Sequence, residues 1–507
     1  MENRGIDRDP CFRPAFCHPV GRFGAGAKKC DSLWLLGMQR AGESADAKLL
    51  CHLPTGFRGC IKHGDAPSNL SAQYLLSLHP PGAPASRKRP QTTGIVAPRF
   101  TLVVAGGYTL FSMISSEQLI YLDNNATTQL DPAVVEEMLP FLTKYFGNPS
   151  SGYGFGAQVR NALDLARGRV AALLGCEPAE IVFTSCGTES NNAAINSALQ
   201  LDSTRQHIVT TAVEHSATWR HCDALSKRGC MVTTVGVDAK GNLDLEELER
   251  AITPQTAIIS AMWANNETGV LFPVEKIAEI ARRHQVLFHT DAIQVVGKIP
   301  IRLADSTINS LSLSGHKLHA PKGVGALYVR KRSAFKPFVI GGSQENNRRA
   351  GTENVASIVA LGKAAECAAT ALEDEATRVR GMRDRFETTV LEKVPETFVN
   401  GDRAARLPNT SNLSFAGVES GAALAMLDRH HVCCSAGSAC RTGSLEASHV
   451  LRAMKLDAER IRGSMRFSFG RFNTETEVDK ALEVIPEAIS KLRRLSSASA
   501  IRQPAGV

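Results

Sequence analysis

The sequence predicts an α/β protein with a large domain built on a mainly parallel sheet and a smaller α+β domain at the C-terminal end. From about residue 119, short apolar segments alternate with helical patterns of about 10–15 residues, which is typical of parallel strands joined by helices. After Asn354 this alternation gives way to a long helical pattern and then to a mixed region with fewer strands. We therefore expect the large domain over residues 119–372 and the small domain over residues 373–500.

The expected elements follow one another in a regular order. Ala157–Leu174 predicts a helix because apolar residues such as Val159 and Val170 recur on one face at helical spacing. Short apolar runs predict strands at Ile181–Phe183, His207–Thr211, Met231–Val235, Ala257–Met262, Val286–His289, Leu311–Leu313 and Ala326–Val329. Helical patterns between them predict helices at Thr188–Leu199, Ser216–Lys227 and about Val274–His284. The long helical pattern after Asn354 extends to about Val390.

Residues 1–112 differ from the rest of the chain. They are rich in Pro, Gly and Arg, contain five cysteines and show no sustained strand or helix period. They also hold 14 Lys and Arg against 7 Asp and Glu, which leaves 44 against 43 in the remainder. We expect an unstructured extension, or a segment that is not translated because synthesis starts at Met113. A targeting extension is the alternative, although acidic residues and cysteines fit a transit peptide poorly.

Charge, hydropathy and cysteine content exclude several classes of protein. The nearly neutral remainder argues against a dedicated nucleic-acid binder. No apolar run reaches the roughly 18 residues of a membrane-spanning helix, and the best attempt, 100–114, is broken by Gly106, Gly107 and Thr109. The 13 cysteines are an odd number and lack the spacing of a disulfide framework. We expect a protein of the reducing cytoplasm that binds neither nucleic acid nor membrane.

Ligands of open α/β sheets lie beyond the carboxyl ends of the strands, so the turns that follow the apolar strands are candidate sites. Ile181–Phe183 leads into Thr184-Ser185-Cys186-Gly187-Thr188, a turn of small residues that opens a helix. The free N–H groups of Gly187 and its neighbours, with the Thr188 hydroxyl, could hold a phosphate group. The alternative is that Thr188 only caps the helix.

Other strand ends carry ionisable and polar side chains. His215 follows one strand, where a histidine is often only structural, and Asn266 lies in the polar turn after another. Asp291 and Gln294 follow a third, where an Asp can face a cationic ring nitrogen or cap a helix. Lys317 follows a fourth, as a surface charge or as a buried amine with the lowered pKa that Schiff-base lysines require. Asp291 and Lys317, 26 residues apart, are the pair that a pyridoxal phosphate site needs.

With these residues in view, the chain from about Ile120 to Ile489 resembles the cysteine desulfurases of the NifS/IscS class, within the fold-type I pyridoxal-phosphate enzymes. The matching stretches are YLDNNATT (121–128), FGNPSS (146–151), EIVFTSCGTESNN (180–192), NNETG (265–269), HTDAIQ (289–294), SLSGHKLHAPKGVGALYVR (312–330), RRAGTEN (348–354), GSACRTGSLEASHVLRAM (437–454) and MRFSFGRFNTETEVD (465–479). They occur in family order, and they do not cover residues 1–112. The chain departs from the pattern at Cys186, where glycine or alanine is common.

The resemblance implies roles around the cofactor ring. Lys317 would hold pyridoxal 5'-phosphate covalently, and Asp291 would pair with the pyridine nitrogen. His215 would stack on the ring and move protons. Gln294 and Asn266 would contact the phenolic oxygen of the ring and the bound substrate.

The resemblance also implies how the phosphate and the substrate are held. The phosphate ligands within one chain would be Gly187, Thr188, Ser314 and His316. Thr352 would reach the phosphate of a neighbouring subunit, so the site would need a homodimer. Arg466 would clamp the substrate carboxylate, a bidentate task that lysine performs poorly.

Cys440 would be the nucleophile. It lies among small and polar residues over 435–444, a composition that predicts a mobile loop rather than core, and the adjacent Arg441 would favour the thiolate. Cys433 and Cys434 end a hydrophobic stretch and are interpreted as packed, inert thiols.

The implied reaction removes sulfur from L-cysteine, gives L-alanine and leaves a persulfide on Cys440. The sulfur would pass to an iron–sulfur scaffold or another acceptor protein, with Cys440 as a transient ligand of a [2Fe-2S] cluster on the scaffold. Two alternatives stay open: a related lyase for selenocysteine or cysteine sulfinate on the same scaffold, and a regulatory protein that keeps the fold without turnover.

Overall fold

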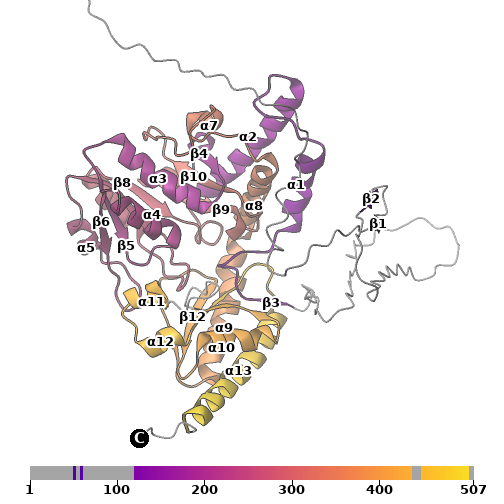
Figure 1. Cartoon of the computed structure of the whole chain (residues 1–507), viewed down its shortest axis with the longest axis vertical. Helices are drawn as coiled ribbons and strands as arrows, with labels where there is room; N and C mark the ends of the chain where they lie inside the picture. The colour runs from indigo at the N-terminus through magenta and orange to yellow at the C-terminus, as the bar shows by residue number, and fades with distance from the viewer. Residues whose placement is uncertain (1–49, 53–57, 61–118, 437–446, 502–507) are drawn as a thin grey trace, which may run out of the picture. The chain divides into compact units, whose positions relative to one another are not determined.

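The computed structural model describes residues 50–52, 58–60, 119–436 and 447–501 (Figure 1). The chain divides into two units, Met1–Ser112 and Met113–Val507. In the first unit, β1 (Leu50–His52) pairs antiparallel with β2 (Arg58–Cys60), where the sequence predicted no regular structure. The remainder of that unit lies outside the described residues, so the expected unstructured extension stays a prediction there.

A seven-stranded sheet forms the centre of the second unit, in the order β4-β10-β9-β8-β7-β5-β6. Its strands are β4 (Ile181–Thr184), β5 (His207–Thr211), β6 (Met231–Val235), β7 (Thr256–Met262), β8 (Leu287–Asp291), β9 (Ser310–Ser314) and β10 (Gly325–Val329). Strands β6, β5, β7, β8 and β9 run parallel, whereas β10 is antiparallel to both β9 and β4. The prediction of a mainly parallel sheet is therefore confirmed, with strand bounds within two residues of those expected.

Helices cover both faces of this sheet. Successive strand residues point to opposite faces, so Ile208 packs in a cluster with α3 (Gly187–Leu201) and α4 (Ser216–Ser226). Its neighbour Val209 packs in the larger cluster with α2 (Gly154–Leu174) and α6 (Val274–Arg283). All four helices confirm the patterns found in the sequence.

The helical stretch that follows Asn354 comprises α8 (Val355–Asp374), a π-helical turn (Glu375–Val379) and α9 (Arg380–Lys393). Its length and mean hydropathy of 1.5 would suit a membrane span, but half of that apolar window is buried inside the protein. A Cβ on Gly362 would lie 2.5 Å from the Ala166 Cα of α2, so glycine allows α8 to approach α2 closely. The apolar face of α8 is therefore explained by packing.

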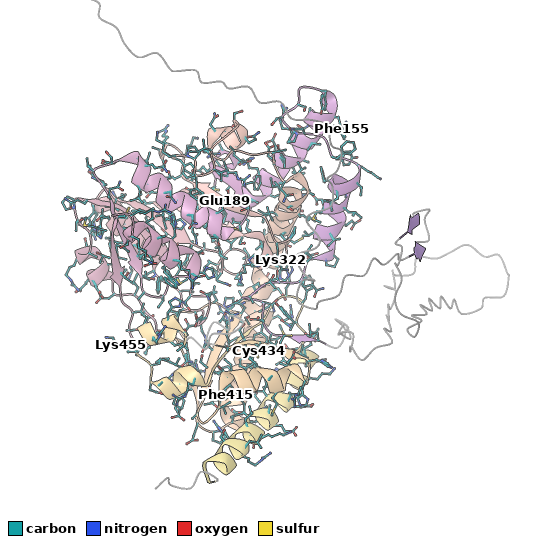
Figure 2. All side chains as sticks on the ribbon, viewed as in Figure 1. Phe155, Glu189, Lys322, Phe415, Cys434 and Lys455 are labelled. Carbon is teal, nitrogen blue, oxygen red and sulfur yellow. The ribbon has the colours of Figure 1, made fainter. Side chains whose placement is uncertain are left out.

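A second core surrounds a four-stranded sheet in the order β11-β12-β15-β14. Its strands are β11 (Thr397–Val399), β12 (Thr410–Phe415), β14 (Ser435–Ala436) and β15 (Ser464–Ser468), all antiparallel to their neighbours. Phe386 of α9, Phe415 and Phe467 fill this core, with α10 (Ser420–Asp428) and α13 (Glu475–Ile501) packed on it. Figure 2 shows Phe415 and Cys434 in this part of the molecule.

The boundary between the two cores is not a single cut at residue 372. β3 (Ile120–Tyr121) pairs in parallel with β13 (Val432–Cys433), and Ile120 belongs to the second core. Conversely, α11 (His449–Ala453) places Val450 in the first core. The remaining elements are α1 (Pro132–Thr143), α5 (Leu245–Arg250), α7 (Gln344–Asn347), α12 (Ala458–Arg462) and the 3-10 turns Pro178–Glu180, Leu303–Asp305 and Gly315–Lys317.

Candidate active site

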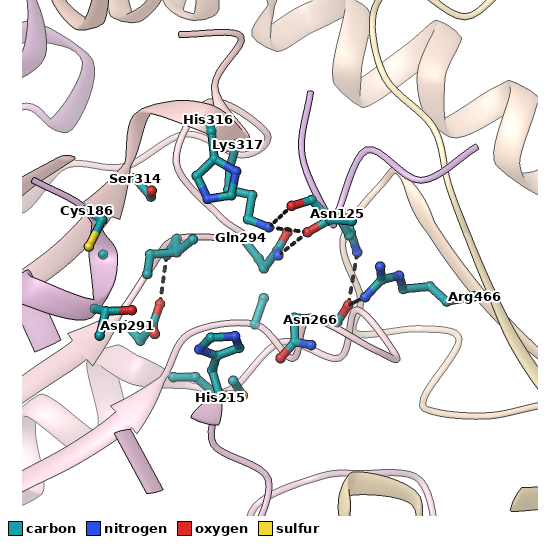
Figure 3. A pocket seen from close by; sticks show the side chains of 16 residues that line it. Asn125, Cys186, His215, Asn266, Asp291, Gln294, Ser314, His316, Lys317 and Arg466 are labelled. Atoms are coloured by element: carbon teal, nitrogen blue, oxygen red, sulfur yellow. Dashed lines mark hydrogen bonds between the residues drawn. The ribbon is translucent and has the colours of Figure 1, made fainter. Parts of the chain in front are cut away.

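A cavity of about 360 Å³ lies at the carboxyl ends of β4, β5, β7, β8 and β9 (Figure 3). Parallel strands present these ends along one edge of the sheet, which brings together turns far apart in the sequence. The lining residues are Asn125, Ala126, Cys186, Gly187, Thr188, His215, Met262, Ala264, Asn266, Asp291, Ile293, Gln294, Ser314, His316, Lys317 and Arg466. The predicted convergence of strand-end residues is therefore present in the fold.

Lys317 ends the 3-10 turn that follows β9, and its amine points into the cavity (Figure 3). Nζ donates hydrogen bonds to the carbonyl oxygens of Asn125 at 2.5 Å and Ala126 at 2.6 Å. Burial, together with the nearby cations Arg466 and Lys298, lowers the pKa of Lys317 to about 7. The alternative of a surface charge is wrong: this is an amine that can be neutral near physiological pH.

Asp291 is the last residue of β8 and is buried. Asn191 Nδ2 donates to Oδ2 at 2.6 Å, and the Ile293 backbone N–H donates to Oδ1 at 3.0 Å. Burial raises the pKa of this carboxyl, so a cation placed against it would restore its charged form. The carboxylate stabilises the turn after β8, rather than capping a helix, and it also faces the cavity.

His215 both caps a helix and lines the cavity. It is the N-cap of α4, and its Nδ1 accepts a hydrogen bond of 3.1 Å from the Ala217 backbone N–H. In the neutral ring the proton therefore sits on Nε2. Burial lowers the pKa of His215, which favours this neutral form, and the ring lies across the cavity from Lys317 (Figure 3).

The start of α3 forms the other end of the cavity. A Cβ on Gly187 would lie 2.1 Å from Ile293 Cδ1, so any larger residue in this turn would require Ile293 to move. The N-cap of α3 is Cys186, without a side-chain hydrogen bond, so the alternative that Thr188 caps the helix is wrong. Orphan N–H groups at the start of a helix favour an anion.

Three buried polar atoms of residues that line the cavity have no hydrogen-bond partner among the described residues: Ser314 Oγ, Gln294 Oε1 and Arg466 Nε. Gln294 Nε2 donates to the Asn125 carbonyl at 3.0 Å. His316 Nδ1 shares a hydrogen bond of 3.2 Å with Thr127 Oγ1, and burial lowers the pKa of His316 to about 4. Because a buried polar atom normally has a partner, the orphaned hydroxyl beside the α3 N-terminus fits the phosphate of pyridoxal phosphate.

Arg466 enters the cavity from β15 of the second core. Its guanidinium donates to the Asn266 carbonyl at 2.9 Å, to Asp123 Oδ1 at 2.7 Å and to Ser435 Oγ at 3.0 Å. Within the described part of the chain, Nε has no acceptor. The side chain is thus fixed in place with donor capacity to spare, as a carboxylate-binding arginine should be.

The structure places one predicted site residue away from this cavity and does not describe another. Thr352 is exposed and does not line it. Cys440 lies outside the described residues, although Ser435 of β14, five positions earlier, pairs with Arg466 in the sheet register. Cys433 and Cys434 are half-buried, and burial raises the pKa of both thiols, in keeping with inert thiols.

Sequence reasoning assigned no role to Asn125. Its carbonyl accepts from both Lys317 and Gln294, and its own amide donates to Thr410 Oγ1 at 2.9 Å. The only signal was the run of polar residues in YLDNNATT directly after a short apolar segment. Cys186, noted in the sequence as a departure, also lines the cavity.

Comparisons with known proteins agree with this site. The aminotransferase class-V family model matches residues 120–481. Cysteine desulfurase 2 of Trichormus variabilis is 53% identical over 378 residues, which cover 75% of this chain and 95% of the relative. A solved NifS-like protein superposes with a TM-score of 0.69 at 36% identity, covering 74% of this chain and all of that one. SspA in complex with cysteine superposes with a TM-score of 0.62 at 34% identity, covering 70% and 99%. The chain therefore belongs to the class-V aminotransferase family and, within it, to the cysteine desulfurases.

Proposed function

We propose that this chain takes the sulfur of L-cysteine, releases L-alanine and carries the sulfur as a persulfide on Cys440 to an acceptor protein. The observation that carries the proposal is the convergence of Lys317, Asp291 and Arg466 on one cavity. Pyridoxal phosphate, when bound there, supplies an electron sink for the negative charge that develops at the substrate Cα.

The side chains of the cavity divide the remaining tasks. Lys317 has a pKa near neutrality, so its Nζ can both remove and return a proton at the substrate Cα. Asp291 would pair with the ring nitrogen, and His215 would lie against the ring. Gln294 and Asn266 would contact the ring oxygen and the substrate.

Arg466 binds the substrate carboxylate. The guanidinium of Arg466 donates hydrogen bonds to Asp123, Ser435 and the Asn266 carbonyl. The Nε–H, which has no partner among the described residues, and one further N–H of the guanidinium then remain available to a ligand. A carboxylate fixed at this point, with its Cα near Lys317, has only its side-chain sulfur free to meet Cys440. A persulfide forms when the Cys440 thiolate attacks that sulfur, whose bond to Cβ breaks.

The residues that would hold the phosphate are Gly187, Thr188, Ser314 and His316, together with Thr352 of a second copy of this chain. Thr352 is exposed rather than turned into its own cavity, which supports a contribution to a partner subunit. Large apolar side chains are also exposed on and near α1, as expected of a homodimer surface: Val135 41%, Leu139 54%, Leu142 57%, Phe146 77% and Tyr153 57%.

The sulfur acceptor is an iron–sulfur scaffold protein in this proposal, with Cys440 as a transient ligand of the [2Fe-2S] cluster that the scaffold carries. A reducing cytoplasm is the proposed compartment. The seven cysteines within residues 119–436 are all free thiols, as a reducing environment maintains.

Alanine and sulfide formation from L-cysteine test the function. Cys440→Ala should bind pyridoxal phosphate normally and form no alanine, whereas Cys433→Ala, a matched control in β13, should keep activity. After borohydride treatment, Lys317→Ala should lose the cofactor mass that the wild-type peptide carries. Normal alanine formation by Cys440→Ala would exclude the proposed nucleophile and favour a lyase that acts without a loop cysteine.

A further inference from the structure

A second, much smaller cavity lies behind Lys317. Its volume is about 20 Å³, enough for one water molecule. Lys317 lines this cavity as well as the larger one, together with Lys298 and Glu375. The side chain that carries the reactive amine therefore lines both the cofactor pocket and a small neighbouring space with polar and apolar walls.

Lys298 and Glu375 are buried charged residues that the proposed reaction does not use, 6% and 5% exposed. Lys298 Nζ donates a hydrogen bond of 2.9 Å to the Gln294 carbonyl, and an ammonium has three hydrogens to donate. Glu375 opens the π-helical turn between α8 and α9. Its Oε2 has no partner in the described part of the chain. The unused N–H donors of Lys298 and the unpartnered acceptor of Glu375 thus line the same cavity, which is large enough for one water molecule.

Lys298 is also joined to Lys317 by a chain of hydrogen bonds. The residue whose carbonyl accepts from Lys298 is Gln294, and the side chain of Gln294 donates to the Asn125 carbonyl at 3.0 Å. That same carbonyl accepts from Lys317 Nζ at 2.5 Å. A change at Lys298 therefore reaches the acceptor that positions the reactive amine.

We propose that the small cavity binds one water molecule between Lys298 and Glu375, and that Lys298 is a positioning residue for Lys317. The inference rests on the proposed function only in taking Lys317 as the cofactor-bearing lysine. The ammonium group of Lys298 is one of the charges that disfavour a proton on the Lys317 nitrogen. Neighbouring cations have the same effect in other enzymes with activated lysines. Burial lowers the pKa of Lys298 to about 8, and the nearby Glu375 carboxylate opposes this shift, which favours the protonated form.

Other charged groups face this assembly from every side. Those that act on Lys317 are Arg466, Asp123 and Asp291; those that act on Glu375 are Asp374, Arg378 and Arg471. His319 also lines the small cavity, with Asp131 and Arg471 beside it. All of these are unchanged in a Lys298 variant, so its effect isolates the one cation.

The test is a pH titration of the absorbance of the cofactor-loaded enzyme without substrate, which reports protonation of the nitrogen contributed by Lys317. Removing a nearby cation favours that proton, so Lys298→Met should move the midpoint upward by about one pH unit. Lys298→Arg keeps the charge and should keep the wild-type midpoint. Lys276→Met, on the exposed face of α6, is the matched control and should not shift it.

If Lys298→Met does not fold, Lys298→Gln carries the same expectation. A crystal structure of the wild-type enzyme should show water bonded to Lys298 and Glu375. An unshifted midpoint in both neutral variants, or a small cavity without water, would overturn the inference. Failure of the proposed function can be told apart from failure of this inference, because the wild-type enzyme would then form no alanine or carry no cofactor on Lys317.

Discussion

Replacing Arg466 with lysine tests the carboxylate clamp most directly. The guanidinium makes three hydrogen bonds, to the Asn266 carbonyl, Asp123 and Ser435, and its Nε has no acceptor among the residues that the structure describes. A lysine ammonium has three hydrogens on one nitrogen, so it cannot keep these contacts and also bind a carboxylate through two donors. We expect L-cysteine to lose at least one charge-assisted hydrogen bond.

A hydrogen bond to a charged group contributes about 1.5–3 kcal/mol, which corresponds to about a 10- to 150-fold increase in KM. The carboxylate is bound both before and during the reaction, so kcat should change much less than KM. Initial rates of alanine formation over a range of L-cysteine concentrations measure both constants. Arg460→Lys is the control, since Arg460 lies on α12 and bonds to Val399 and Asn400 away from the cavity. An unchanged KM in Arg466→Lys would refute the clamp.

Two further predictions concern the cofactor turn and a buried acid. Gly187→Ala places a Cβ 2.1 Å from Ile293 Cδ1 and should weaken pyridoxal phosphate binding in an absorbance titration. Gly168→Ala, which meets nothing within 4 Å, should not. Burial raises the pKa of Glu214 to about 8 from 4.5, so its contribution to stability is complete below pH 4.5 and is lost as the pH rises through 8. Between pH 5 and pH 9 the melting temperature of Glu214→Gln should therefore fall less than that of the wild type. An equal fall in the two proteins would contradict this.

The part of the site on the main sheet could be predicted from the sequence because its geometry follows from strand periodicity. Each buried apolar run marks a parallel strand, and carboxyl ends of parallel strands lie on one edge. His215, Asp291 and Lys317 each follow such a run, and all three line the cavity. The local pattern therefore determines where these residues meet, even though it does not give their roles.

The contributions of the second core could not be predicted in this way. Arg466 lies in the middle of an antiparallel strand, where periodicity alone would assign it to a surface or a core, and only the family resemblance pointed to it. Asn125 contributes mainly its carbonyl oxygen, which every residue possesses and no sequence pattern marks. At the N-terminus of α3 the sequence left a cap by Thr188 open, because a Thr near a helix start usually caps it, whereas here Thr188 lies inside the first turn.

The segment that follows β3 explains how the two cores share one site. Ile120 is packed in the second core, and the Ser468 carbonyl of β15 accepts a hydrogen bond from Asn124 Nδ2 at 3.0 Å. The next residue, Asn125, offers its carbonyl to Lys317 of the first core. Since Ser468 lies two positions after Arg466 on the same strand, the segment ties the reactive amine to the strand that carries the carboxylate-binding group. The relative position of these two groups is thus set largely by main-chain acceptors, which side-chain substitution cannot remove.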